Sequence, residues 1–225
     1  MILIGLGAKA RQGKNYVGNY MKEVIPEIQF YSFADELKKY CRDHHNELEP
    51  QWQLTHQTNG IPLWKDDPIY GCTPILQWFG TDVMRKKDPN HWIKIVEEQL
   101  SKVTPNSVNI VIDVRFPNEA DFIKENNGYM VEVIRVNEDG TRYYDPGRDK
   151  NHLSEVALDD YGNWDFVIRC KSGDFTSLRY KALGVLHAIV QMHSLRDAAV
   201  PDGTGDDSDP TSLGPFHGGD SSWSK

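Results

Sequence analysis

Hydrophobic positions follow two alternating patterns between residues 1 and 195. Short apolar runs of the kind that form buried strands cover residues 2–6, 29–33, 107–114, 129–136 and 165–170. Between them, apolar residues recur every three or four positions, which predicts helices over residues 17–25, from Asp35 onward, and over 73–86, 91–103, 117–126 and 176–192. This alternation predicts an α/β fold of three layers, with helices on both faces of a mostly parallel sheet.

Three segments lack these patterns. Residues 47–71 contain many turn-forming residues and two tryptophans, and we interpret them as an insertion over the functional edge of the sheet. Residues 138–151 are polar and contain Arg142 and Arg148. Residues 196–225 are rich in Gly, Ser, Asp and Pro, so they cannot bury enough apolar surface to repay the entropy of ordering. We therefore predict one domain over residues 1–195 and a flexible acidic tail.

Composition and charge narrow the range of functions. The chain has 225 residues, 39% of them hydrophobic, which is enough for one globular domain with a substantial core. We expect a soluble cytoplasmic protein, because the sequence shows neither a signal-peptide pattern nor an apolar run of membrane-spanning length. Six acids and one base between Asp197 and Lys225 supply five of the eight net negative charges. The remainder is also slightly acidic, which argues against general affinity for nucleic acid.

One sequence motif resembles a phosphate-binding loop. The stretch GAKARQGKNY lies between the first predicted strand and the first predicted helix, where a phosphate-binding loop of the form Gly-x-x-x-x-Gly-Lys-Ser/Thr would stand. Gly13 permits close approach of the backbone to a phosphate, and Lys14 supplies a positive charge. Ala8 replaces the usual first glycine, and Asn15 replaces the hydroxyl residue that binds Mg²⁺. On these residues alone, nucleotide binding and an ordinary basic turn both stay open.

Charged side chains near other predicted elements extend this picture. Arg115 follows a buried strand at the carboxyl edge of the sheet, where open α/β folds bind ligands, so we expect it to hold a phosphate. An arginine that only caps the next helix is the alternative. Asp113 ends an apolar strand, where a carboxylate is costly unless paired, so it is a candidate for Mg²⁺ binding through water or for orienting Arg115. Asp82 and Arg85 lie three residues apart on one predicted helix, as ordinary surface ion pairs also do.

Four motifs, in this order, resemble those of the bacteriophage deoxynucleoside monophosphate kinases: GAKARQGKNY, ILQWFGTDVMRKKDPNHWIKIV, VIDVRFPNEADFIKENNG and HLSEVAL. The resemblance spans residues 2–158 and implies a P-loop kinase fold. It implies an enzyme that uses ATP and Mg²⁺ to phosphorylate a deoxynucleoside monophosphate, in the cytoplasm of the infected host cell if the protein is of phage origin. Asn15, where the family often has Asp, and Tyr16, where Thr is frequent, depart from the family pattern.

The resemblance also implies roles for individual residues. ATP would be bound by Ala8, Lys9, Ala10, Arg11, Gln12, Gly13, Lys14, Asn15 and Tyr16. Charge on the transferred group would be stabilised by Lys14, Arg11, Arg115 and Arg148, the last of these in a lid-like loop over residues 138–151. The acceptor would contact Asp35, Lys38, Gln77, Asp82, Arg85, Trp92, Asp113, Arg115, His152 and Glu155. Asn15 and Asp113 would hold the Mg²⁺.

Two other functions stay open on the sequence. One is a P-loop kinase whose acceptor is a hydroxymethylated base within phage DNA, which would need a strand-binding groove of basic and aromatic residues. The other is a nucleotide-binding regulator without transfer activity, which the loss of the loop hydroxyl and a weak metal site would produce. The sequence is also compatible with a homodimer, and it gives no reason to expect a membrane partner.

Overall fold

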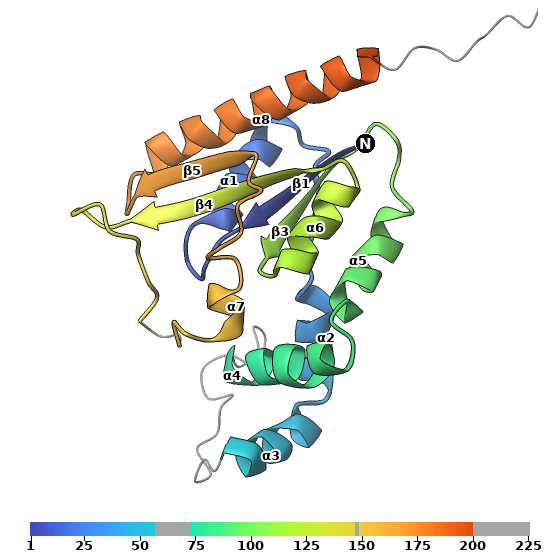
Figure 1. The fold of residues 1–225 in the computed structure, drawn as a ribbon, viewed down its shortest axis with the longest axis vertical. Coiled ribbons are helices and arrows are strands. Elements are labelled where there is room, and N and C mark those ends of the chain that lie inside the picture. Colours follow the sequence, from blue (N-terminus) through green and yellow to red (C-terminus); the bar gives the residue numbers. More distant parts are fainter. Residues whose placement is uncertain (57–72, 147–148, 200–225) are drawn as a thin grey trace, which may run out of the picture.

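A five-stranded sheet forms the centre of the computed structural model, which describes residues 1–56, 73–146 and 149–199 (Figure 1). The strands are β1 (Ile2–Gly7), β2 (Gln29–Tyr31), β3 (Val108–Val114), β4 (Tyr129–Val136) and β5 (Phe166–Lys171). Their order in space is β2-β3-β1-β4-β5, and every neighbouring pair is parallel. The prediction of a mostly parallel sheet is therefore confirmed.

Strand β1 is the central strand, and its residues alternate between the two faces of the sheet. Ile4 lies opposite Ile110 of β3 and Tyr129 of β4, and all three side chains are fully buried. The register between β1 and β3 shifts between Gly5 and Gly7, immediately before the predicted phosphate loop. Both ends of this loop are thus attached to regular elements, because it leaves the central strand and enters helix α1 (Lys14–Val24).

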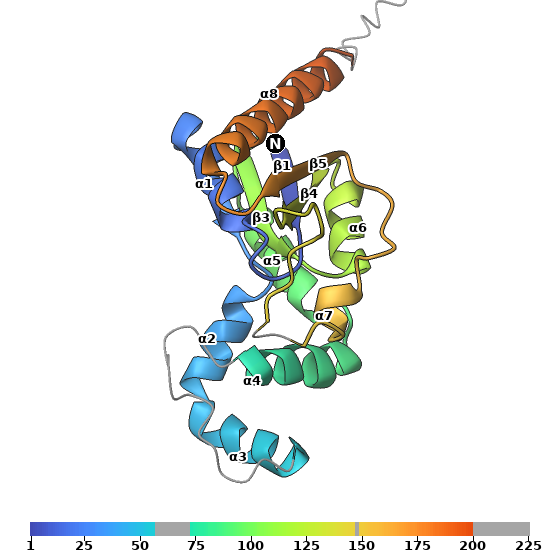
Figure 2. The same ribbon diagram turned by 90° about the vertical axis from the view of Figure 1, so that its left-hand side faces the viewer.

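One face of the sheet is covered by α1 and by α8 (Phe175–Ala199), which pack against each other (Figures 1 and 2). Apolar residues of α8 recur on the side that faces the sheet, and Leu178, Ala182, Leu186 and Ile189 are all buried. They join a core that also contains residues of α1 and of the strands. No helix in the described part of the chain is long and apolar enough to cross a membrane.

The opposite face carries α6 (Pro117–Glu125), which packs against β1 and β4. Its core continues into α5 (His91–Leu100), α2 (Asp35–Asp43), α3 (His45–His56), α4 (Thr73–Gln77) and a π-helix, η1 (Trp78–Arg85). In both views α2, α3 and α4 form the end of the molecule away from α8 (Figures 1 and 2). The short helix α7 (Leu153–Val156) lies between this end and the sheet.

The structure differs from the sequence prediction in four elements. The helix predicted over residues 73–86 divides into α4 and the π-helix η1, and α3 occupies the first part of the predicted insertion over residues 47–71. Strand β2 ends at Tyr31, two residues early, because Ser32 and the residues after it turn toward β3 to bond Asp113. Helix α8 continues past Met192 to Ala199. Residues 57–71 of the predicted insertion and 200–225 of the predicted tail lie outside the described residues.

Candidate active site

A cavity of about 590 Å³ opens at the carboxyl edge of the sheet. The predicted phosphate loop forms one side of it, and the ends of β2 and β3 form the floor. Residues of α4, η1 and α5 form the other side, with Arg115 and Glu119 beside them. This is the edge at which parallel α/β sheets bind ligands, and a volume of this size accommodates a small molecule.

The phosphate loop has the backbone that such a loop requires. Gly13 precedes α1 with φ 102° and ψ 11°, in the left-handed region that glycine adopts at little cost, and Arg11 also has a positive φ of 53°. The buried Lys14 side chain crosses the loop, and its Nζ donates to the carbonyl oxygens of Ala8 at 3.1 Å and Lys9 at 3.4 Å. The first turn of α1 therefore presents backbone N–H groups and an ammonium group to one end of the cavity.

The segment after β4 holds the phosphate loop in place. Gln12 is buried, and its Nε2 donates to the carbonyl of Tyr143 at 2.7 Å while its Oε1 accepts from the backbone N–H of Arg135 at 2.8 Å. Arg11 forms an ion pair with Asp145 at 3.0 Å. The predicted lid-like loop therefore contacts the phosphate loop directly, whereas Arg148 lies outside the described residues.

Lys9 and Glu155 join the phosphate loop to α7. Lys9 Nζ donates to the backbone carbonyl of Glu155 at 2.7 Å and pairs with Asp159 at 2.5 Å. The Glu155 carboxylate accepts from the backbone N–H of Ala10 at 2.8 Å and from Arg115 Nη1 at 3.1 Å. These contacts connect α7, the loop and the end of β3, so Lys9 and Glu155 support the walls of the cavity rather than line it.

Asp113 fixes the end of β3 against the end of β2. Its Oδ2 accepts from Ser32 Oγ at 2.6 Å and from the backbone N–H of Ala34 at 3.0 Å, and its Oδ1 accepts from the N–H of Phe33 at 2.9 Å. A carboxylate has about four lone-pair directions, so three donors leave room for one further partner. These three hydrogen bonds offset the cost of placing the Asp113 carboxylate at the end of an apolar strand.

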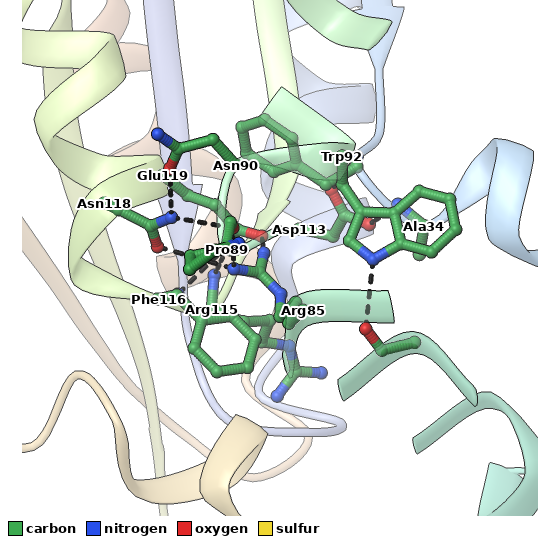
Figure 3. A network of polar contacts seen from close by, with 12 residues as sticks. Ala34, Arg85, Pro89, Asn90, Trp92, Asp113, Arg115, Phe116, Asn118 and Glu119 are labelled. Atoms are coloured by element: carbon green, nitrogen blue, oxygen red, sulfur yellow. Dashed lines mark hydrogen bonds and ion pairs between the residues drawn. The ribbon is translucent and has the colours of Figure 1, made fainter. Parts of the chain in front are cut away.

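Arg85 and Glu119 form a buried ion pair at the other end of the cavity (Figure 3). The Arg85 guanidinium lies over the ring of Phe116, 3.8 Å from its centroid, and its Nη1 donates to the carbonyl of Pro89 at 3.1 Å. Glu119 Oε2 accepts from the backbone N–H groups of Arg115 at 2.7 Å and Phe116 at 3.1 Å. One carboxylate therefore holds both the guanidinium and the turn that leads into α6.

Burial changes the acidity of this pair. It raises the pKa of Glu119 to about 7, and the charge of Arg85 and the two backbone N–H groups oppose the rise. Burial also lowers the pKa of Arg85, against the opposing effect of the Glu119 and Asp113 carboxylates.

Exposed aromatic rings stand beside the loop. Tyr16, in the first turn of α1, lines the cavity, and its ring centroid lies 5.0 Å from that of Phe175 at the start of α8. Both side chains are about half exposed, Tyr16 at 51% and Phe175 at 49%. A flat apolar surface in this position can stack against a planar ring.

The cavity brings together most of the residues that the sequence predicted. Its lining includes Ala10, Arg11, Gln12, Gly13, Lys14, Asn15, Tyr16, Lys38, Gln77, Arg85, Trp92, Asp113 and Arg115. Ala8 and Lys9 lie behind the loop, and Asp35, Asp82, His152 and Glu155 are outside the lining.

Asp35, Asp82 and His152, which were expected to contact the acceptor, lie outside the lining of the cavity. Asp35 pairs with Lys38 on the surface, and His152 caps α7 by accepting from the N–H of Ser154 at 3.2 Å. Asp82 is exposed, and Arg85 pairs with Glu119 instead of with Asp82, because the π-helical turn changes which residues share a side of the helix. The acceptor roles of these residues stay predictions.

Several lining residues were missed by sequence reasoning. They are Ser32, Phe33, Ala34, Leu37, Leu76, Thr81, Ile112, Phe116, Glu119 and Arg135. Only Glu119 had a local signal, since a glutamate two residues after the first-turn Pro117 is placed to accept from the backbone N–H that precedes the helix. The others come from segments that are distant in sequence, and their meeting depends on the order of the strands.

The lining of the cavity therefore combines charged and apolar side chains. Lys14 and the loop N–H groups line it at the phosphate loop, Arg85 lines it beside Glu119, and Arg115 is tied to the loop through Glu155. Phe33, Leu37 and Trp92 supply apolar surface. Within the described residues no three His, Cys, Asp or Glu side chains gather as a metal site. Asn15 and Asp113, the predicted magnesium ligands, are among the residues with side-chain oxygens that line the cavity.

Two proteins of assigned function are similar to the chain over much of its length, while no family model matches it. A protein of Acanthamoeba polyphaga mimivirus, provisionally named a deoxynucleotide monophosphate kinase, is 33% identical over 183 residues, which cover 75% of this chain and 88% of that protein. The deoxynucleoside-5'-monophosphate kinase of Escherichia phage T5 is 26% identical over 123 residues, which cover 50% of this chain and 49% of the phage protein.

Solved structures of kinases also align with the fold. A gluconokinase from Sinorhizobium meliloti 1021 is 14% identical, with 87% of this chain and 96% of that chain covered and a TM-score of 0.43. A dephospho-CoA kinase from Campylobacter jejuni is 15% identical, with 85% and 98% covered and a TM-score of 0.44. Because both scores are below 0.5, the fold assignment rests on the sheet order and the phosphate loop.

Proposed function

Because the chain belongs to the deoxynucleotide monophosphate kinase family, we propose that it transfers the γ-phosphoryl group of ATP to the phosphate of a deoxynucleoside monophosphate. The observation that carries this proposal is one cavity whose lining contains both the phosphate loop with Lys14 and the arginines Arg85 and Arg115. In the reaction an oxygen of the acceptor phosphate bonds to the γ-phosphorus, and the bond from that phosphorus to the β–γ bridging oxygen breaks. The products are a deoxynucleoside diphosphate and ADP.

On the donor side, the loop N–H groups and Lys14 would hold the β- and γ-phosphates. Lys14 Nζ now bonds two carbonyl oxygens of its own loop, so ATP binding would replace these bonds with bonds to phosphate. Arg11 and Arg115 are placed to offset charge on the transferred group, since both line the cavity. The Tyr16 and Phe175 rings offer a surface on which a purine can stack.

The residues present fit a magnesium ion that arrives with ATP. Mg²⁺ prefers oxygen ligands, keeps several waters and commonly takes only one or two protein ligands in addition to phosphates. Asn15 offers an amide oxygen, and Asp113 offers one remaining acceptor position, which suits contact through water. When bound, the ion would neutralise negative charge on the phosphates.

On the acceptor side, Arg85 and Arg115 would bind the phosphate, and the apolar lining residues of the cavity would enclose the nucleoside. Gln77 lines this part, and its Nε2 atom is buried without a hydrogen-bond partner among the described residues. Such a group is costly unless a ligand satisfies it, so Gln77 is suited to donate to the acceptor base. No general base is needed, because the attacking phosphate is already an anion.

The test is a transfer assay with labelled ATP and Mg²⁺. The acceptors are the four deoxynucleoside monophosphates and, separately, hydroxymethylated DNA. We expect label in deoxynucleoside diphosphates, and at least a hundredfold loss of kcat with Lys14→Ala because the phosphate clamp is lost. Lys102→Ala is the control, since Lys102 is exposed and pairs only with Glu98 among the described residues.

The same assay tests the two alternative functions. Label in DNA but not in free nucleotides would replace the proposal with a DNA kinase. ATP binding without transfer to any acceptor would favour a nucleotide-binding regulator. Full activity of Lys14→Ala would show that the loop is not the donor site.

A further inference from the structure

We propose that Glu119 is a positioning residue for the acceptor phosphate: it fixes the Arg85 guanidinium so that one edge of it faces the cavity. This inference rests on the proposed function and names a residue on which the function depends. Glu119 comes from α6 and Arg85 from the last turn of η1, and both line the cavity (Figure 3).

Glu119 is fully engaged and has almost no access to solvent. Its side chain is 3% exposed, and it accepts from the Arg85 guanidinium and from two backbone N–H groups. A carboxylate with three donors in a buried position cannot move without leaving donors unsatisfied. Glu119 is therefore a rigid anchor for the Arg85 guanidinium.

The contacts of Arg85 determine which of its N–H groups can reach a substrate. Of its five N–H groups, two on Nη1 are directed to Pro89 and Asn118, at 3.1 and 3.4 Å, and one on Nη2 is directed to Glu119. The Phe116 ring covers one face of the guanidinium. Within the described residues this leaves the Nε group and one N–H of Nη2 as donors that phosphate oxygens can accept from.

The residues around Arg85 and Glu119 are also hydrogen-bonded to one another. Asn118 Nδ2 donates to the carbonyl of Pro89 at 3.0 Å and to Asn90 Oδ1 at 2.8 Å. The Pro89 carbonyl therefore accepts both from Asn118 and from Arg85. Helix α6 and the turn before α5 thus hold the guanidinium from two sides, as expected for a side chain that must bind a ligand at a defined angle.

A purely structural role is the alternative, because the carboxylate also caps α6. Glu119→Gln separates the two roles. The amide oxygen of glutamine still accepts from the N–H groups of Arg115 and Phe116, whereas the charge that holds Arg85 is lost. Glu98→Gln is the matched control, since Glu98 is an exposed glutamate in an ion pair with Lys102.

We would measure the steady-state constants and, by calorimetry, the Kd of a deoxynucleoside monophosphate for the wild-type protein, Glu119→Gln, Arg85→Ala and the double variant. We expect Glu119→Gln to raise the Kd and KM of the acceptor about tenfold and to leave the KM of ATP unchanged. In the Arg85→Ala background it should add less than twofold, because its effect acts through Arg85.

An acceptor Kd within twofold of wild type in folded Glu119→Gln would overturn the inference, as would a full tenfold effect in the Arg85→Ala background. If Glu119→Gln does not fold, Asn118→Ala decides, with a twofold to fivefold rise in acceptor Kd expected and no change overturning the inference. Absence of transfer by the wild-type protein would instead reject the proposed function, while the binding data would still test the inference.

Discussion

The carboxylate of Glu155 accepts a hydrogen bond from the backbone N–H of Ala10, with an N–O distance of 2.8 Å, although 145 residues separate them. The other carboxylate oxygen accepts from Arg115. Helix α7, which is only four residues long, is thereby fixed to the phosphate loop and to the end of β3. The loop in front of the cavity is consequently stabilised by a residue that does not line it.

Glu155→Ala should destabilise the protein by about 1–3 kcal/mol, because it leaves the Ala10 N–H and the Arg115 guanidinium without their shared acceptor. Urea unfolding would measure the change. We expect Glu155→Gln to retain most of the stability, since its oxygen still accepts one of the two bonds. Equal stability of the alanine variant and the wild type would show that these bonds contribute little.

Gly13→Ala should impair both folding and ATP binding, because the φ of 102° at this position is unfavourable for a residue with a Cβ atom. We expect a loss of about 1–2 kcal/mol in the free energy of unfolding and weaker binding of ATP by calorimetry. Gly184→Ala is the control: Gly184 is exposed within α8 and a Cβ there meets nothing within 4 Å. That change should stabilise the protein slightly. Identical effects of the two substitutions would contradict the assigned loop geometry.

The contribution of Glu119 to the free energy of unfolding should fall as the pH rises from about 4.5 to about 7. Burial raises the pKa of Glu119 from 4.5 to about 7, so the folded protein binds more protons than the unfolded chain across this interval. The contribution is fully present below 4.5 and lost above 7, with a slope of at most about 1.4 kcal/mol per pH unit. Arg85 and Asp113 are the charged groups that face it.

Comparison with Glu119→Gln isolates this contribution. Urea unfolding at several pH values would give the difference in the free energy of unfolding between the two proteins. That difference should shift in favour of the variant as the pH rises through the interval, since glutamine does not titrate. A difference that is constant with pH would show that Glu119 keeps an ordinary pKa.

The sequence predicts the order of elements and the position of the phosphate loop because both depend on local signals. The strands are apolar runs, and the loop between β1 and α1 has its glycine and lysine at fixed spacing. A residue such as Gly13 needs no distant partner to adopt its conformation. The fold class and the position of the phosphate loop could therefore be inferred before the structure was known.

The surroundings of Arg85 could not be predicted to the same degree. Asp82 and Arg85 have the spacing of an ion pair on an α-helix, but the structure pairs Arg85 with Glu119, 34 residues further along the chain. Nothing in the apolar pattern distinguishes a π-helix from the α-helix that the sequence predicts over residues 73–86. The position of Glu119 after Pro117 indicates a helix cap. Its pairing with Arg85 depends on how η1 packs against α6, which no local pattern indicates.

The π-helix η1 has a consequence for how this segment can change by insertion and deletion. A π-helical turn contains one more residue than an α-helical turn, so removal of one residue between Trp78 and Val83 would restore ordinary α-helical pairing. Every residue before the deletion would then rotate by about 100° relative to Arg85. Either Arg85 would leave Glu119 or Gln77 would leave the cavity, so we expect the length of this turn to be under stronger selection than most of its side chains.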